Sequence, residues 1–136
     1  MEKNGEVSVH RYQKAADQGD ADAQFFMGVA YKYGKGVEPS DEEAVQWYRR
    51  AAGQGDADAQ FKMGVAYENG RGVEPSDEAA VQWNKRAADQ GHEKARFNLT
   101  SLRKAISFRD FIPDDDEIEA ALAAAEAKAA ENQEPH

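Results

Sequence analysis

Two consecutive stretches of the chain are nearly identical: "AADQGDADAQFFMGVAYKYGKGVEPSDEEAVQWYRR" (Ala15–Arg50) and "AAGQGDADAQFKMGVAYENGRGVEPSDEAAVQWNKR" (Ala51–Arg86). They align without a gap over a period of 36 residues and differ at eight positions. Self-similarity at such a period is typical of solenoids, in which each unit buries its apolar face against its neighbours. The repeat therefore decides the fold.

Partial copies flank the two full ones. A third copy starts at Ala87 with "AADQGHEKARFNLTSLRK" and then diverges, and "VSVHRYQKAA" ahead of the first copy matches the end of a unit. We expect one domain made of five consecutive parts. These are an N-terminal partial repeat helix (1–14), repeat 1 (15–50), repeat 2 (51–86), a partial, divergent repeat 3 (87–105) and a C-terminal capping segment (106–136).

Each unit carries two runs of apolar or small residues at helical spacing. The runs are Ala23, Met27, Ala30 and Tyr31, and then Ala44, Val45, Trp47, Tyr48, Ala51 and Ala52. Spacing of three and four without a period-two stretch predicts two amphipathic helices per unit and an all-α fold. Asp20 or Asp22 can N-cap the first helix, and Ser40 with Glu43 forms a capping box for the second. Because Ala79 replaces that glutamate in the next unit, we expect a slightly weaker helix there.

The glycines serve the turns and the packing of these helices. Gly34 lies just past the first helix, where a left-handed C-cap is usual. A phosphate-binding loop would need a Lys after its last Gly and a preceding strand, and Gly36 is followed by Val37, so we interpret the loop as an interhelix turn. Gly28 and its counterpart Gly64 lie inside the first helices, which favours close approach of the second helices at their tryptophans, Trp47 and Trp83.

The residue pattern "AxxGxAxAQxxMGxAYxxGxGVxxxxxxAVxW", read from Ala16 and again from Ala52, resembles the Sel-one-like repeat (SLR) family, a relative of the tetratricopeptide repeat. The resemblance covers about residues 7–104. It implies a short right-handed α-solenoid of antiparallel helix pairs whose first helices line a concave face. The third unit departs from the pattern, with Thr100 in place of the buried glycine and Arg103 in place of the tyrosine.

If the first helices line the concave face as the resemblance implies, one set of positions faces a partner. Phenylalanines recur in it at the repeat spacing and would form a ladder, although the same residues could instead pack between neighbouring repeats. Positions that vary between near-identical units are better candidates for specificity, because packing does not dictate them. The predicted partner-binding residues are Asp22, Phe25, Phe26, Val29, Lys32, Tyr33, Asp58, Phe61, Lys62, Val65, Glu68, Asn69, Lys94, Phe97, Ser101 and Lys104.

Charge is distributed unevenly along the chain. Residues 1–109 have a net charge of −1 and residues 110–136 a net charge of −8, which together give the total of −9. The C-terminal segment is interpreted as an acidic, alanine-rich capping helix, with Ile106, Phe108, Phe111 and Ile112 covering the end of the solenoid. The rival interpretation is a free tail or a partner-binding helix.

The sequence lacks the residues that several classes of function require. The body has no cluster of Lys and Arg for nucleic acid, and no apolar run is long enough to span a membrane. There are no cysteines, and His10, His92 and His136 are far apart in sequence, so we expect no metal site, no cofactor and no catalytic constellation. Enzymes of a β-lactamase-like type known among cysteine-rich SLR proteins need disulfides that this chain cannot form.

We therefore expect a non-catalytic protein–protein interaction module, an adaptor or scaffold that binds a protein or peptide on its concave face. Resemblance implies that such proteins are often bacterial. An immunity- or antitoxin-like inhibitor of an effector is the alternative, since an acidic tail steers toward a basic partner. Stacking of solenoid ends into a weak end-to-end oligomer, rather than a monomer, is a third hypothesis. No leader is visible, which favours the cytoplasm, or the periplasm or secretion if a leader has been removed.

Overall fold

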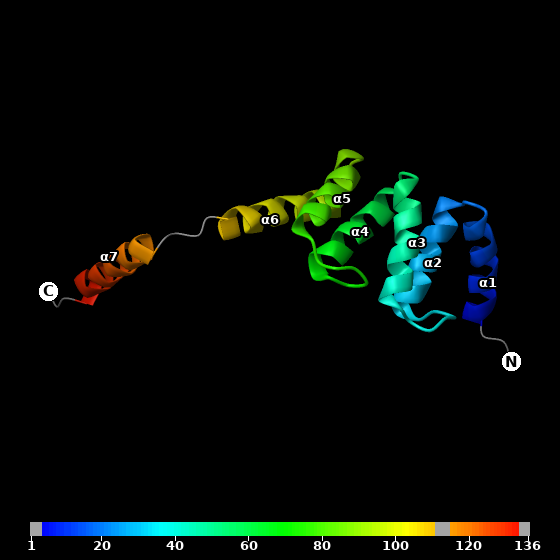
Figure 1. Ribbon diagram of the computed structural model, residues 1–136, viewed down its shortest axis with the longest axis horizontal. Helices are drawn as coiled ribbons and strands as arrows, with labels where there is room; N and C mark the ends of the chain where they lie inside the picture. Colours follow the sequence, from blue (N-terminus) through cyan, green and yellow to red (C-terminus); the bar gives the residue numbers. More distant parts are fainter. Residues whose placement is uncertain (1–3, 111–114, 134–136) are drawn as a thin grey trace. The chain divides into compact units, whose positions relative to one another are not determined.

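The computed structural model describes the backbone of residues 4–110 and 115–133, and every element of those residues is helical. The chain divides into two compact units, Met1–Lys104 and Ala105–His136. The helices, labelled in Figure 1, are α1 (Asn4–Asp17), α2 (Ala21–Tyr33), α3 (Asp41–Gly53), α4 (Ala57–Asn69), α5 (Asp77–Asp89), α6 (Glu93–Asp110) and α7 (Asp115–Gln133).

Helices α1 to α5 follow one another as neighbours in space, each packed on the next (Figure 1). Small residues on the facing sides let the helices approach closely, and Met27 and Met63, both fully buried, fill the centre of successive units. The largest apolar cluster joins the second helix of one unit to the first helix of the next, from Ala44 on α3 to Ala66 on α4. The predicted all-α solenoid of helix pairs is confirmed.

The N-caps of α2 and α4 are aspartates. Asp20 Oδ1 accepts a hydrogen bond from the Ala23 N–H at 2.9 Å, and Asp56 makes the same bond to Ala59. Of the two candidates for the first cap, the structure uses Asp20, since helix α2 begins one residue later. The predicted left-handed C-cap is also confirmed, because Gly34 has φ 67° and ψ 38°.

The predicted capping box of α3 forms only in half. Ser40 Oγ accepts from the Glu43 N–H at 3.2 Å, as expected. However, the Ser40 N–H donates to the Tyr31 carbonyl at 2.9 Å, so it does not need the Glu43 side chain. Ser76 makes the equivalent bond to Tyr67 at 3.0 Å. The contact on which the expected weakening of α5 by Ala79 rested is therefore missing from the described structure of both units.

Gly28 and Gly64 do mark close helix contacts, but the contacting residues are not the tryptophans. A Cβ placed on Gly28 would lie 2.5 Å from Cε1 of Tyr48, and one on Gly64 would lie 2.4 Å from Nδ2 of Asn84. Trp47 packs instead in the cluster formed with α1 and α2. The contact predicted for Trp47 is made by Tyr48, and the contact predicted for Trp83 is made by Asn84.

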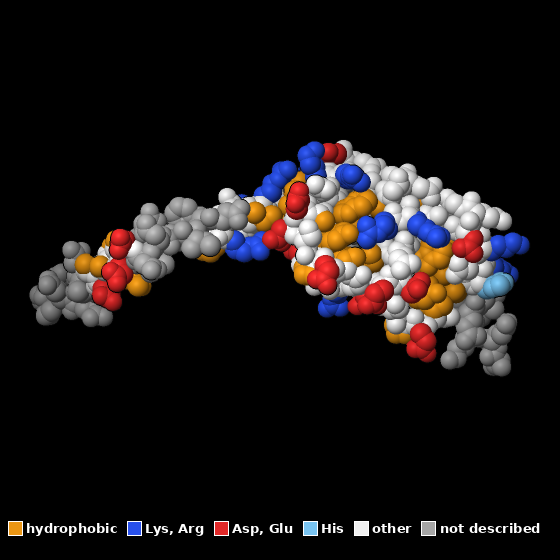
Figure 2. Space-filling view, in the orientation of Figure 1, with side chains coloured by type: hydrophobic (Ala, Val, Ile, Leu, Met, Phe, Trp, Pro, Cys, Tyr) orange, Lys and Arg blue, Asp and Glu red, His pale blue; other side chains and the backbone are white. Residues whose placement is uncertain are grey.

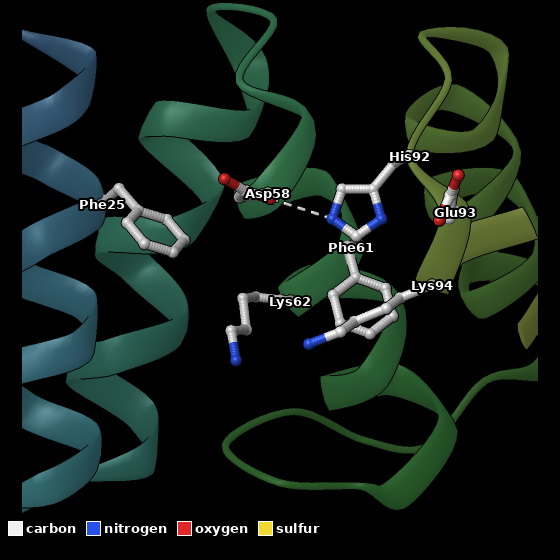
Figure 3. A pocket seen from close by; sticks show the side chains of 7 residues that line it. All are labelled: Phe25, Asp58, Phe61, Lys62, His92, Glu93 and Lys94. Carbon is white, nitrogen blue, oxygen red and sulfur yellow. Dashed lines mark hydrogen bonds and ion pairs between the residues drawn. The ribbon is translucent and has the colours of Figure 1, made fainter.

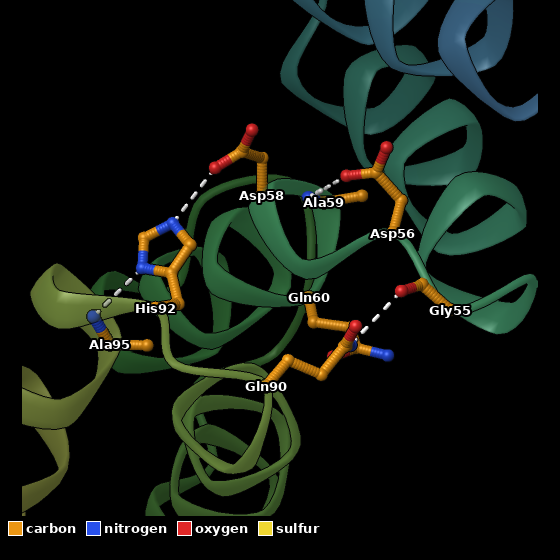
Figure 4. Close-up of polar contacts among 8 residues, drawn as sticks. All are labelled: Gly55, Asp56, Asp58, Ala59, Gln60, Gln90, His92 and Ala95. Atoms are coloured by element: carbon orange, nitrogen blue, oxygen red, sulfur yellow. Dashed lines mark hydrogen bonds and ion pairs between the residues drawn. The ribbon is translucent and has the colours of Figure 1, made fainter.

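A glutamine pair connects each unit to the next. The side-chain amide of Gln54 donates to Gln24 Oε1 at 2.8 Å and to the Gly19 carbonyl at 2.9 Å. Gln90 repeats this pattern 36 residues later, donating to Gln60 Oε1 at 2.9 Å and to the Gly55 carbonyl at 3.0 Å (Figure 4). The buried glutamines Gln24 and Gln60 thus have partners, which buried polar groups require.

The third copy of the repeat departs from the two full copies along α6. Helix α6 buries Ala95, Leu99 and Leu102, while Thr100 and Arg103, at the positions of Gly28 and Tyr31, are exposed. Polar side chains therefore stand at the positions where the two full copies have a buried glycine and a half-buried tyrosine. In the Ala105–His136 unit, α7 is confirmed as a helix, whereas Phe111 and Ile112 lie outside the described residues, and the capping role of this segment stays a prediction.

Candidate functional site

A groove with a volume of about 380 Å³ lies between the first helices of three successive units. Its lining residues define what we call the Phe61 groove, shown in Figure 3: Phe25, Asp58, Phe61, Lys62, His92, Glu93 and Lys94. The volume falls in the usual range of ligand pockets, roughly 300–1,000 Å³. The groove is therefore large enough for one or two side chains of a bound peptide.

Two aromatic rings provide the apolar lining, and both have a structural role as well. Phe25 packs against the cluster of α3 and α4, with its ring centroid 5.6 Å from that of Tyr48. Phe61 packs against the cluster of α5 and α6. Each ring is half-buried, so one side supports the next repeat while another faces the groove. The third residue of the predicted ladder, Phe97, is 74% exposed and is not part of the lining.

His92 occupies the N-cap position of α6, which Asp20 and Asp56 hold in the earlier units. The Ala95 N–H donates to His92 Nδ1 at 3.1 Å, so this nitrogen carries no proton. Nε2 then holds the ring proton and donates it to Asp58 Oδ1 at 2.9 Å (Figure 4). The imidazole also stacks on Phe61, with 4.8 Å between ring centroids. These three contacts fix the ring at the wall of the groove, with neither nitrogen available as a base.

Two lysines bring positive charge into the groove. Lys62 of α4 is half-buried and Lys94 of α6 is exposed, and neither forms a hydrogen bond or ion pair with any described residue. In the Met1–Lys104 unit, Figure 2 shows Lys and Arg side chains lying among hydrophobic ones on the face in view. This mixture of cations and apolar surface suits a peptide ligand that has both charged and apolar side chains.

Five of the predicted partner-binding residues meet in this groove: Phe25, Asp58, Phe61, Lys62 and Lys94. Lys32 and Val65 line a second, much smaller cavity of about 20 Å³ beside Tyr48. Phe26 stacks on Tyr12 of α1, with ring centroids 3.9 Å apart. The other predicted residues are placed along α2, α4 and α6 away from the groove lining: Asp22, Val29, Tyr33, Glu68, Asn69, Phe97, Ser101 and Lys104.

Sequence reasoning missed His92 and Glu93 as groove residues. His92 stands where both full units have an aspartate, and Glu93 where both have an alanine. The signal was present, because a departure from the repeat marks a position that packing leaves free. The predicted set began one residue later, at Lys94, the counterpart of Asp22 and Asp58.

The cavity beside Tyr48 contains an unusual polar atom. The Tyr48 side chain is buried, and its hydroxyl has no hydrogen-bond partner among the described residues. Burial, and to a smaller extent electrostatic repulsion from Tyr33, raises the pKa of this hydroxyl above its ordinary value. At about 20 Å³ the cavity is too small for a peptide side chain, so it is not a candidate binding site.

The repeat pattern has counterparts in known proteins. The Sel1 repeat matches residues 1–20, 21–56 and 57–92. The chain belongs to the Sel1 repeat family. Sel1 repeats are generally modules of protein–protein interaction, and the family is typically non-enzymatic. The family and its helical fold confirm the resemblance drawn from the motif.

Three solved structures of Sel1-type proteins are similar to this chain. A Sel1 repeat protein from Oxalobacter formigenes is 42% identical with a TM-score of 0.69, and the match covers 73% of this chain and 39% of that one. The protective antigen c5321 of uropathogenic Escherichia coli is 41% identical with a TM-score of 0.63, covering 64% and 19%. Helicobacter pylori cysteine rich protein B is 28% identical with a TM-score of 0.64, covering 67% and 68%. No protein of curated function matches.

This chain spans less than half the length of the first two of these proteins. All three are bacterial, in line with the expectation from the motif. Within the described residues, no group of three or more His, Asp or Glu side chains is placed to hold a metal ion, and no helix is long and apolar enough to cross a bilayer.

Proposed function

We propose that this Sel1 repeat array is a non-catalytic adaptor or scaffold that binds a peptide or loop of another protein in the Phe61 groove. The observation that carries the proposal is the groove itself, in which α2, α4 and α6 place two aromatic rings and two unpaired lysines around about 380 Å³. Aromatic anchors within a rim of charged groups are typical of protein interfaces.

The contacts of His92 support a binding role over a catalytic one. General base catalysis needs a nitrogen free to accept a proton, and Nδ1 of His92 already accepts from Ala95 while Nε2 donates to Asp58. The ring instead forms a rigid wall beside Phe61. A rigid wall lowers the entropy lost on binding, which favours affinity.

An inhibitor of the immunity or antitoxin type would use the same groove, with the partner's functional segment as the ligand. Adaptor and inhibitor differ in what the partner does, not in the geometry of this site. The identity of the captured protein therefore decides between them, and in either case the acidic segment 110–136 would steer toward basic surface of the partner outside the segment that the groove binds.

The absence of cysteines from the sequence permits a direct test. Lys62→Cys places a single thiol in the groove, and the control Gln46→Cys places one on the exposed surface of α3. Each variant is labelled with a bulky maleimide, checked for helicity by circular dichroism, and used to capture partners from the native host. We expect a partner that both unlabelled variants and labelled Gln46→Cys capture, and that labelled Lys62→Cys does not. Equal capture by both labelled proteins would contradict the proposal.

A further inference from the structure

The two groove lysines stand at positions where the repeats differ. Lys62 stands where the preceding repeat has Phe26, and Lys94 stands where the two preceding repeats have Asp22 and Asp58. Packing within the solenoid therefore requires neither lysine. In Figure 3 both side chains extend from their helices, α4 and α6, into the lower part of the groove near Phe61.

The carboxylates of the groove do not neutralise these lysines. Asp58 accepts the hydrogen bond from His92 Nε2 at 2.9 Å, and Figure 3 shows it on the opposite side of the groove from the lysine ammonium groups. Glu93 lies beyond His92 in the same view and forms no ion pair with a described residue. The part of the groove beside Phe61, on the side that faces Phe25, thus carries positive charge next to apolar surface.

We propose that the ligand of the Phe61 groove is an acidic peptide. A carboxylate of the peptide accepts hydrogen bonds from Lys62 and Lys94, and a neighbouring aliphatic or aromatic side chain packs between Phe25 and Phe61. This inference rests on the proposed function and specifies the chemistry of the partner. The carboxylate comes from an Asp or Glu side chain or from the C-terminus of the partner, and the two sources share the same recognition.

Charge complementarity is the argument for this occupant. A carboxylate provides acceptors for two ammonium groups that have no acceptor in the described structure. A nucleic acid fits less well, because its repeated phosphates would meet Asp58 and Glu93 at the rim of the groove, and because residues 1–109 have a net charge of −1. A basic peptide would place a third and a fourth cation beside the two lysines.

The test begins with an unbiased peptide-display selection on the full chain. Wild type is compared with a Lys62→Gln, Lys94→Gln double variant and with Lys14→Gln, which removes an exposed lysine of α1 outside the groove. We expect wild type and Lys14→Gln to enrich peptides that combine Asp or Glu with an apolar residue, and the double variant to lose this preference.

Synthetic peptides then measure the size of the effect. Fluorescein-labelled copies of the enriched peptide are compared with versions that carry Gln for Glu, Asn for Asp, or an amidated C-terminus, by fluorescence anisotropy. Each lysine substitution is expected to weaken binding roughly three- to fivefold, the upper part of the range of exposed ion pairs, and added salt to reduce the difference. Loss of affinity on amidation identifies the C-terminal carboxylate as the source, and loss with Gln or Asn identifies a side chain.

Two results would overturn the inference in distinguishable ways. In the first, the enriched peptides lack acidic residues and bind the double variant as tightly as wild type, but labelling at Lys62→Cys still blocks their binding. That result excludes an acidic ligand and leaves the groove as the binding site. If no enriched peptide is blocked by that label, the groove is not the site, and the proposed function fails together with the inference.

Discussion

The side-chain amide of Gln54 donates a hydrogen bond to Oε1 of Gln24 at 2.8 Å, and so joins the loop after α3 to the buried face of α2 in the unit ahead. Gln90 and Gln60 repeat the contact at 2.9 Å. In a solenoid each unit is stabilised by its neighbours, so a polar bond repeated between units fixes their register as well as their separation.

Replacing Gln54 tests this contact. Gln54→Ala leaves Gln24 Oε1 without its donor, and we expect the free energy of unfolding to fall by about 1 kcal/mol in urea denaturation. Gln18→Ala is the matched control, since Gln18 holds the same position in the unit ahead and its side chain bonds to no described residue. Equal losses in the two variants would show that the glutamine pair does not connect the units.

The close contact at Gly28 predicts opposite effects for two glycine substitutions. Gly28→Ala drives a methyl group into the buried ring of Tyr48, so we expect a loss of about 1–3 kcal/mol in the free energy of unfolding. Gly53→Ala adds a methyl group at a helical position with no atom within 4 Å and should stabilise the protein by about 0.5–1 kcal/mol. Thermal unfolding followed by circular dichroism measures both, and a Gly28→Ala variant as stable as Gly53→Ala would refute the packing described here.

The raised pKa of Tyr48 predicts a loss of stability in alkali. The unfolded chain releases the phenol proton above about pH 10, whereas the folded chain retains it, so the free energy of unfolding falls as the pH rises beyond that value. One proton contributes a slope of at most about 1.4 kcal/mol per pH unit. Tyr48→Phe removes this contribution. Urea denaturation from neutral to alkaline pH should show a shallower decline for the variant, and parallel curves would contradict the prediction.

His92 should stabilise α6 through its cap. His92→Ala removes the acceptor of the Ala95 N–H and the stack on Phe61, and we expect it to lower the free energy of unfolding by about 1 kcal/mol. His92→Asn keeps an N-cap acceptor and should recover part of that loss. His10→Ala, at an exposed position of α1, serves as the control. A His92→Asn variant no more stable than His92→Ala would show that capping is not the reason.

Much of the fold was predictable because each local signal has one physical use. An Asp or Ser just before a helix and a Gly just after it favour helix ends. The structure places Asp20, Ser40 and Gly34 as caps. The contact at Gly28 was harder to assign, since Trp47 and Tyr48 are adjacent and about 100° apart on α3, and spacing alone does not fix the rotation of a helix. The capping box failed because a backbone carbonyl, that of Tyr31, competes for the same N–H.

The candidate site was only partly predictable. Phe25 and Phe61 follow from the repeat spacing, but whether such rings pack or bind depends on the separation of α2, α4 and α6, which sequence does not give. The groove shows that they border both the core and the open space. His92 could be placed there only once the start of α6 was known.

Site-specific photo-crosslinking shows whether the partner lies in the Phe61 groove. A diazirine-bearing lysine analogue, which keeps the ammonium group and adds little volume, replaces Lys62 in the Phe61 groove or, as a control, Gln82 on the exposed surface of α5, and the captured partner is irradiated in complex with each. We predict a crosslink from position 62 to one peptide segment of the partner and none from position 82. A crosslink from position 82 with none from position 62 would contradict the account.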